Sequence, residues 1–166
     1  ERRIPGAVVA VARRGRLVYF EAVGFQDRER GIPMRRDSLF AIASMTKPWV
    51  GVATLMLAEQ GQLAIGDPVQ RFLPELGNRR VIAGSAGAAQ QPGPGGTWET
   101  VAARRPITIM DLLRHTAGLT YGNGGTTPLH RAYPQSSNSS ATQSDAAGFI
   151  ARLAELPLHH QPGRVY

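Results

Sequence analysis

The sequence contains no cysteine, and Lys47 is the only lysine among its 19 basic residues. Without cysteine the chain has neither disulfides nor thiolate metal ligands, so its redox compartment stays open. Aromatic residues make up only 7% of the chain, and they do not alternate with the arginines as base-stacking residues would. The formal net charge of +7 is therefore interpreted as a solvated arginine surface, and no nucleic-acid partner is expected.

Long hydrophobic runs are also absent. The most apolar stretch, residues 39–58, is interrupted by Lys47, Pro48 and Gly51, which suits a buried helix better than a membrane span. We expect no transmembrane segment. The strand-like run that follows Glu1 begins abruptly and shows no signal-peptide pattern, so we expect that upstream residues are missing and the localisation stays unknown.

The choice of lysine at position 47 is the strongest indication of function. Arginine supplies a fixed positive charge everywhere else in the chain, whereas a lysine amine can lose its proton on burial. Ser44 precedes Lys47 by three residues, and on a helix such residues share a face. The pair is predicted to be a serine nucleophile with a lysine general base.

Two β-rich runs at the N-terminus, residues 7–11 and 17–23, are separated by a turn containing Gly15 and predict an antiparallel hairpin within residues 1–25. A catalytic helix with almost no polar face is predicted from Ser44 to Gly61, with Pro48 in its first turn. Such a helix should be buried. It opens a helical region that we place at residues 38–166.

Three further helices are predicted. One begins at Asp67–Pro68 and ends near Pro74, and one begins at a capping box at Thr108 and ends near Gly118. The third covers about Ser144 to Glu155. Two low-complexity segments, residues 84–97 and 122–144, are predicted to be mobile loops.

This inventory does not make a complete fold. A two-stranded hairpin is marginal in water, and a helix that is apolar all round needs partners on every side. We therefore expect the chain to be an N-terminal fragment of one hydrolase domain, and its main partner to be the remainder of its own fold beyond residue 166.

Several motifs occur in a characteristic order along the chain. They are Ile4–Val9, Phe40–Pro48 with its S-x-x-K motif, Gly61–Leu63, Asp67–Val69, Ile107–Leu119, Leu156–Leu158 and Gln161–Gly163. The ordered set resembles the serine β-lactamase and penicillin-binding-protein superfamily, in the branch of the class C β-lactamases. The form of Leu112–Gly122 is most similar to the family VIII carboxylesterases.

The resemblance implies an α/β (α+β) fold of the β-lactamase/transpeptidase type. This fold has an antiparallel sheet flanked by helices, plus a helical subdomain. This chain would hold only the first hairpin and the helical part. The family assigns Ser44 as the acylated nucleophile and Lys47 as its partner, and it places Tyr121 at the substrate entrance. Its second-motif tyrosine would fall two residues beyond Tyr166, although a small deletion would make Tyr166 that residue.

The implied function is a bacterial serine hydrolase that forms an acyl-enzyme at Ser44, acting as a carboxylesterase on short acyl esters. A class C-type β-lactamase or a D-alanyl-D-alanine carboxypeptidase is the alternative, and a penicillin-binding sensor without turnover is an alternative of another class. The expected partner is thus a small ester or β-lactam, with no cofactor. The doublet His159–His160 lacks other ligands nearby in the sequence, so no metal site is predicted. The fragment alone is expected to be inactive.

Overall fold

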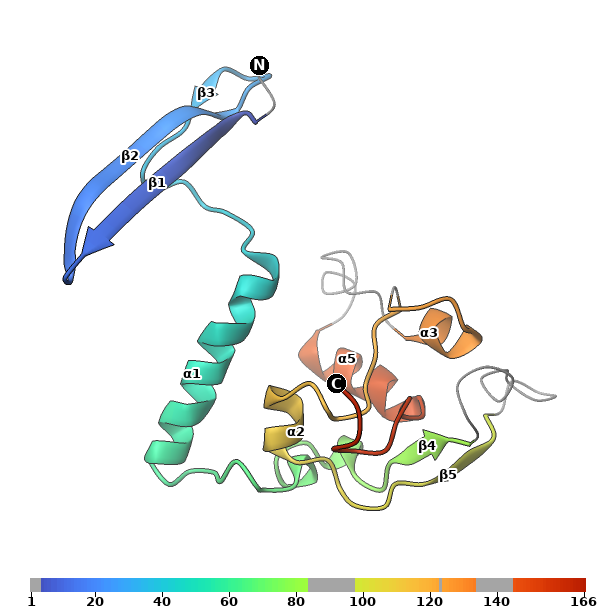
Figure 1. Cartoon of the computed structure of the whole chain (residues 1–166). Helices are drawn as coiled ribbons and strands as arrows, with labels where there is room; N and C mark the ends of the chain where they lie inside the picture. Colours follow the sequence, from blue (N-terminus) through green and yellow to red (C-terminus); the bar gives the residue numbers. More distant parts are fainter. Residues whose placement is uncertain (1–3, 84–97, 123, 134–144) are drawn as a thin grey trace. The chain divides into compact units, whose positions relative to one another are not determined.

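A computed structural model describes residues 4–83, 98–122, 124–133 and 145–166. The chain divides into two compact units, Glu1–Lys47 and Pro48–Tyr166, and Figure 1 shows their elements. The whole predicted loop 84–97, and part of the loop 122–144 with Ser144 in it, lie outside the described residues.

The first unit is a small antiparallel sheet in the order β1-β2-β3. β1 (Gly6–Arg13) and β2 (Arg16–Asp27) form the predicted hairpin, and β3 (Ile32–Pro33) adds a short third strand. Gly24 has φ +77, and a Cβ there would lie 2.4 Å from the carbonyl oxygen of Pro5. Only glycine allows the chain to come this close to its neighbour.

The helix predicted to be catalytic is preceded by a 3₁₀ turn, η1 (Ala43–Met45), and α1 itself covers Thr46–Glu59. No residue of α1 is buried, and the side chain of Trp49 is 70% exposed. The predicted burial of this helix is therefore wrong for the described chain. The apolar composition of α1 was read correctly, but none of the described elements covers it enough to bury a residue.

The helix predicted from Asp67–Pro68 is also wrong, because two 3₁₀ turns stand there: η2 (Val69–Arg71) and η3 (Pro74–Leu76). The carboxylate of Asp67 accepts hydrogen bonds from the Ala64 amide at 2.9 Å and from Arg71 at 2.8 Å. It closes the preceding loop instead of capping a helix. Pro74 removes the N–H that a continued helix would need.

Two short strands that the sequence reasoning missed, β4 (Arg80–Ile82) and β5 (Thr100–Ala102), pair antiparallel. The segment around Leu158 extends this sheet, because the Ile82 amide donates to the Leu158 carbonyl at 2.9 Å and the Leu158 amide donates to the Arg80 carbonyl at 2.8 Å. The end of the described chain is thereby fixed to β4.

Three helices complete the second unit. α2 (Ile109–Leu113) begins at the predicted capping box but ends well before Gly118, because His115 takes φ 57. α3 (Pro128–Ala132) lies inside the predicted loop 122–144, where Thr127 caps it. α5 (Ala146–Glu155) matches the third predicted helix.

These elements enclose one apolar core, whose most buried members are Ile107, Leu129 and Leu158. The core also contains Val69, Leu76, Val81, Ile82, Ile109, Ala117, Tyr133 and Leu153. Every one of these side chains belongs to the second unit. No helix in the described part of the chain is long and apolar enough to cross a bilayer.

Candidate active site

Ser44 is held in an unusual backbone turn. It is the middle residue of η1, between Ala43 and Met45, and α1 starts two residues later. Ala43 has φ 45, a left-handed conformation that costs a residue with a Cβ on the order of 1 kcal/mol or more. Backbone strain of this kind is concentrated at functional sites. Alanine gives no warning of a positive φ, so sequence reasoning missed this feature.

Ser44 and Lys47 lie in direct contact. The Nζ of Lys47 donates a hydrogen bond to the Oγ of Ser44 at 3.1 Å, as the three-residue spacing predicts. Both residues are exposed in the described chain. Within the described segments neither side chain bonds to any other titratable group, so the two residues form an isolated serine–lysine dyad.

This contact can operate in either direction. A charged ammonium donates to the hydroxyl oxygen, whereas a neutral amine would accept the hydroxyl proton across the same distance. The geometry therefore suits a general base for the serine. The chemical role of the two residues remains a prediction.

Tyr121 belongs to the second unit and is 50% exposed. Its carbonyl accepts the Gly124 amide at 2.9 Å, which closes a tight turn. The Ser44–Lys47 dyad lies in the first unit. A contact between Tyr121 and substrate remains a prediction.

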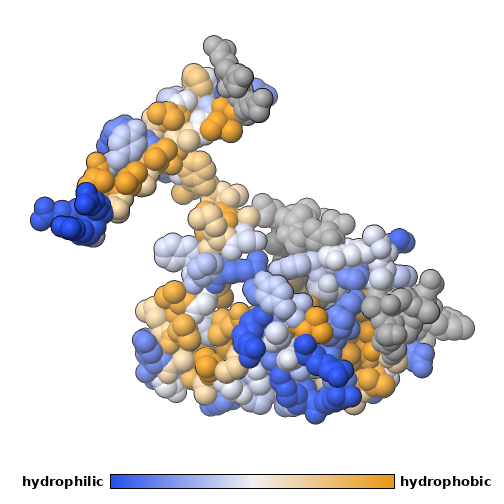
Figure 2. Space-filling view, viewed as in Figure 1, coloured by the Kyte–Doolittle hydropathy of each residue, from blue (hydrophilic) through white to orange (hydrophobic). Residues whose placement is uncertain are grey.

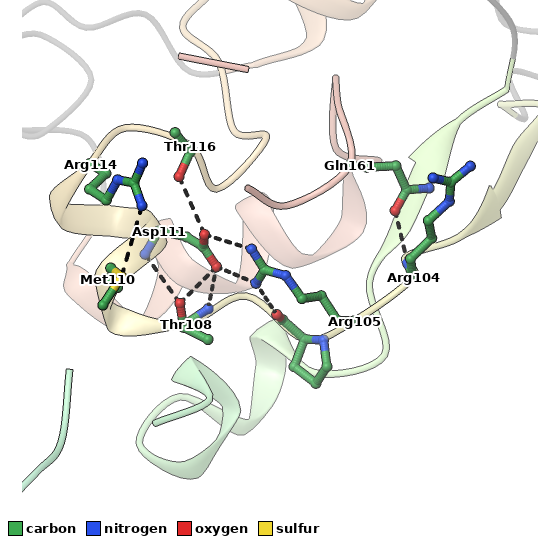
Figure 3. Close-up of polar contacts among 9 residues, drawn as sticks. Arg104, Arg105, Thr108, Met110, Asp111, Arg114, Thr116 and Gln161 are labelled. Atoms are coloured by element: carbon green, nitrogen blue, oxygen red, sulfur yellow. Dashed lines mark hydrogen bonds and ion pairs between the residues drawn. The ribbon is translucent and has the colours of Figure 1, made fainter. Parts of the chain in front are cut away.

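The motif around residues 107–119 is organised by the buried carboxylate of Asp111, which sequence reasoning recognised only as a capping residue. Arg105 donates to both of its oxygens, at 2.6 and 2.9 Å, and the backbone amide of Thr108 donates at 2.9 Å. The hydroxyl groups of Thr108 and Thr116 also donate to it, as Figure 3 shows. The hydrogen bonds from Arg105, followed by those from Thr108, hold the pKa of Asp111 well below its usual range.

A backbone hydrogen bond connects this motif with the segment that leads to Tyr166. The Gly163 amide donates to the Thr116 carbonyl at 2.7 Å. A Cβ at Gly163, where φ is +82, would lie 2.1 Å from the Arg105 guanidinium. A side chain at this position would therefore displace the arginine from Asp111.

Three histidines gather beside this region. The rings of His130 and His159 are 4.8 Å apart, and those of His159 and His160 are 4.2 Å apart. Burial first, then the charges of His160 and His130, lower the pKa of His159 to about 4. Burial and the charge of His130 lower the pKa of His160. Sequence reasoning noticed the doublet but not His130, which is distant in the chain.

The histidines do not form a metal centre by geometry. Among the residues that the structure describes, no group of three or more His, Cys, Asp or Glu side chains is arranged to hold a metal ion. His115 lies apart from the cluster, with its ring edge-to-face against Tyr166 at 5.7 Å. Tyr166 is otherwise 91% exposed.

The chain is similar to a known protein family and to several of its members. The Beta-lactamase family model matches residues 1–166. Esterase EstB of Burkholderia gladioli is 38% identical over 164 residues, which are 98% of this chain and 37% of EstB. Protein Rv1367c of Mycobacterium tuberculosis is 41% identical over 160 residues, 96% of this chain and 37% of that protein.

Solved structures show the same relationship. EstCE1, described as a hydrolase with promiscuous acyltransferase activity, superposes with a TM-score of 0.70 at 32% identity and covers 97% of this chain and 38% of its own. Simvastatin synthase LovD of Aspergillus terreus, in a mutant form, has a TM-score of 0.66 at 27% identity, covering 98% of this chain and 37% of its own.

The chain thus spans little more than a third of the length of these relatives. It matches them over nearly all of its own length, from the hairpin to the segment that ends at Tyr166. We conclude that the chain belongs to the Beta-lactamase family.

Proposed function

We propose that this chain carries the nucleophilic part of a serine carboxylesterase that acts on short acyl esters. The observation that supports the proposal most is the 3.1 Å contact between Lys47 Nζ and Ser44 Oγ. The names of two relatives, an esterase and a hydrolase with acyltransferase activity, favour ester substrates over β-lactams.

In the proposed acylation, Ser44 Oγ attacks the ester carbonyl carbon while its proton passes to Lys47 Nζ. The bond from the carbonyl carbon to the alcohol oxygen then breaks, and the departing alcohol takes the proton from Lys47. Water repeats the sequence on the acyl-serine and releases the acid. Each step needs the hydroxyl and the amine within hydrogen-bond distance, which the dyad provides.

The developing oxyanion needs donors as well. Amides in the first turn of a helix have no acceptor within that helix, and they point toward its N-terminal end. Ser44 lies in such a turn, and we assign its backbone N–H as one oxyanion donor. One donor of this kind contributes about 3 kcal/mol to transition-state stabilisation.

We propose that the complete centre also requires groups equivalent to the part of EstB that this chain does not span. In the described chain the dyad is exposed, so water would weaken each electrostatic interaction that the mechanism uses. The 166 residues alone are expected to be inactive. Tyr121 is proposed to line the entrance for the acyl group.

Release of the acyl group to an alcohol is the second candidate activity. It is favoured by the superposition on EstCE1 and on simvastatin synthase, whose names describe acyl transfer and synthesis. The acyl-serine step is the same in both cases. Only the nucleophile that ends the cycle differs.

The test is timed mass spectrometry of the protein at its natural length with p-nitrophenyl acetate and, separately, with a penicillin. A short-lived acetyl adduct with continuous release of nitrophenol supports the esterase, and Ser44→Ala should abolish both. Turnover of penicillin without ester turnover would favour a lactamase, and a lasting penicillin adduct would favour a sensor. Either result would contradict the proposal.

A further inference from the structure

A pocket of about 410 Å³ opens beside β4 and β5 in the second unit. Four arginines contribute to its lining: Arg79, Arg80, Arg104 and Arg105. The side-chain amides of Gln70 and Asn78 add neutral donors, and no aspartate or glutamate is among the lining residues. Among the described residues this lining supplies positive charge and donors but no carboxylate, and only Arg105 is paired with one, Asp111, which lies outside the lining.

Arg79 is the buried arginine of this lining. The residue is only 7% exposed, and its two terminal nitrogens donate to the carbonyls of Leu153, Ala154 and Leu156 at the end of α5. Its Nε is buried and has no hydrogen-bond partner among the residues that the structure describes. Burial lowers the pKa of Arg79, because removing a charge from water without a counter-ion is unfavourable.

The neighbouring arginines differ in how much of their hydrogen-bonding capacity is used. Arg80 donates to the hydroxyl and the carbonyl of Thr100, which fixes its guanidinium without neutralising it. Arg105 is paired with Asp111. Arg104 donates through its backbone amide to Gln161, at 2.8 Å, and Figure 3 marks no hydrogen bond or ion pair from its guanidinium.

Three of the four guanidiniums therefore have no carboxylate partner among the described residues. The planar fork of arginine matches phosphate and carboxylate oxygens in pairs. A bound anion would use the donors of Arg104 and be attracted by the positive charge of Arg79. The volume exceeds that of a single small ion and lies in the range of small-molecule sites.

We propose that this pocket binds a small oxyanion that carries two or more negative charges, such as a phosphate ester or a polycarboxylate. The binding would not involve Ser44 chemistry and would give this unit a ligand that the esterase reaction does not require. Arg104 is the residue that such a ligand would engage first, because its guanidinium is exposed and makes no other interaction in the described chain.

The test is calorimetric titration of the chain with pyrophosphate and, separately, with citrate, at constant ionic strength. We expect saturable binding with one site. Arg104→Gln should weaken it at least about tenfold, since one bidentate charged pair is lost. Arg152→Gln removes the same charge from an exposed site on α5 outside the pocket, and it should change the affinity less than about twofold.

The two probes separate the possible sources of the oxyanion. Binding of pyrophosphate alone identifies phosphate chemistry, binding of citrate alone identifies carboxylates, and binding of both identifies the chemistry they share. Because the Arg104 guanidinium makes no hydrogen bond or ion pair in the described chain, the thermal midpoint of Arg104→Gln should equal that of the parent. The proposal is overturned if neither probe saturates, or if the two variants weaken binding equally.

Discussion

The N-terminal region, residues 6–59, exposes large apolar side chains, whereas the C-terminal region, residues 69–158, encloses them in a core. In the hairpin and α1, Val18 is 61% exposed and Trp49 is 70% exposed. In the other region, Leu129 and Leu158 are fully buried. Figure 2 shows apolar residues on the surface of the hairpin.

Apolar content alone therefore does not make a core. The C-terminal region closes its core because its helices, its two-strand sheet and the segment at Leu158 all meet there. One buried carboxylate of this region, Asp111, is also paired locally, with Arg105. The N-terminal region has comparable apolar residues but no such enclosure, and it is the region that contains the Ser44–Lys47 dyad.

Replacing one leucine in each region would test this contrast with the largest expected effect. Leu158→Ala should lower the free energy of unfolding by about 3–5 kcal/mol, because it leaves a cavity in a closed core. Leu55→Ala, at a half-exposed site of α1, should change it by less than about 1 kcal/mol. Urea unfolding measures both, and equal losses would contradict the proposed difference.

Removing a buried and an exposed carboxylate would sharpen the contrast for charges. Asp111→Ala should cost about 3 kcal/mol, because Arg105 and the Thr108 amide lose their shared acceptor. Asp37→Ala breaks the exposed pair with Arg35 and should leave the unfolding midpoint unchanged. A loss from Asp37→Ala as large as that from Asp111→Ala would refute this interpretation.

The histidine cluster should make the C-terminal region sensitive to acid. The pKa of His159 is lowered from 6.5 to about 4 in the folded chain, so the unfolded chain binds more protons between these values. The stability that the neutral His159 contributes is fully present above pH 6.5, its ordinary pKa. This stability is lost as the pH falls toward about 4, its pKa in the folded chain.

We therefore expect the thermal midpoint to drop by several degrees between about pH 7 and pH 5, where carboxylates titrate little. His159→Gln should flatten this dependence, while His115→Gln, outside the cluster, should retain it. A pH profile that is the same for the parent and His159→Gln would argue against the cluster as the cause.

The smallest expected effect concerns a helix cap. Asp145 accepts the Gly148 amide at 2.8 Å at the start of α5, and Asp145→Ala should cost about 1 kcal/mol. Glu59→Ala, at the last residue of the exposed α1, serves as the control and should stay within about 0.5 kcal/mol. Chemical denaturation can resolve the two, and no loss at Asp145 would show that α5 does not depend on its cap.

Local patterns in the sequence predicted much of this architecture. Two β-rich runs around a glycine turn predicted the hairpin, and Thr108 with Asp111 predicted the start of α2, because turns and caps are decided by near neighbours. The Ser44–Lys47 contact was predictable for the same reason. The fold and the family follow the resemblance that the ordered motifs showed.

Features that depend on distant residues were not predictable in this way. The β4–β5 pair joins three-residue strands across a long insertion, and neither strand is long enough to show a period. His130 meets His159 only after folding. The left-handed φ of Ala43 has no marker in its residue type. The exposure of α1 was mispredicted because composition does not reveal which partner covers a helix.

The most direct test of the central claim, that Lys47 activates Ser44, is the intact mass of the natural-length protein after brief exposure to p-nitrophenyl butyrate. The parent should gain one butyryl group that maps to Ser44. Lys47→Arg keeps the positive charge but removes the base, so it should remain unmodified while its circular dichroism matches the parent. Butyrylation of Lys47→Arg at nearly the parent rate, or an adduct on a residue other than Ser44, would contradict the account.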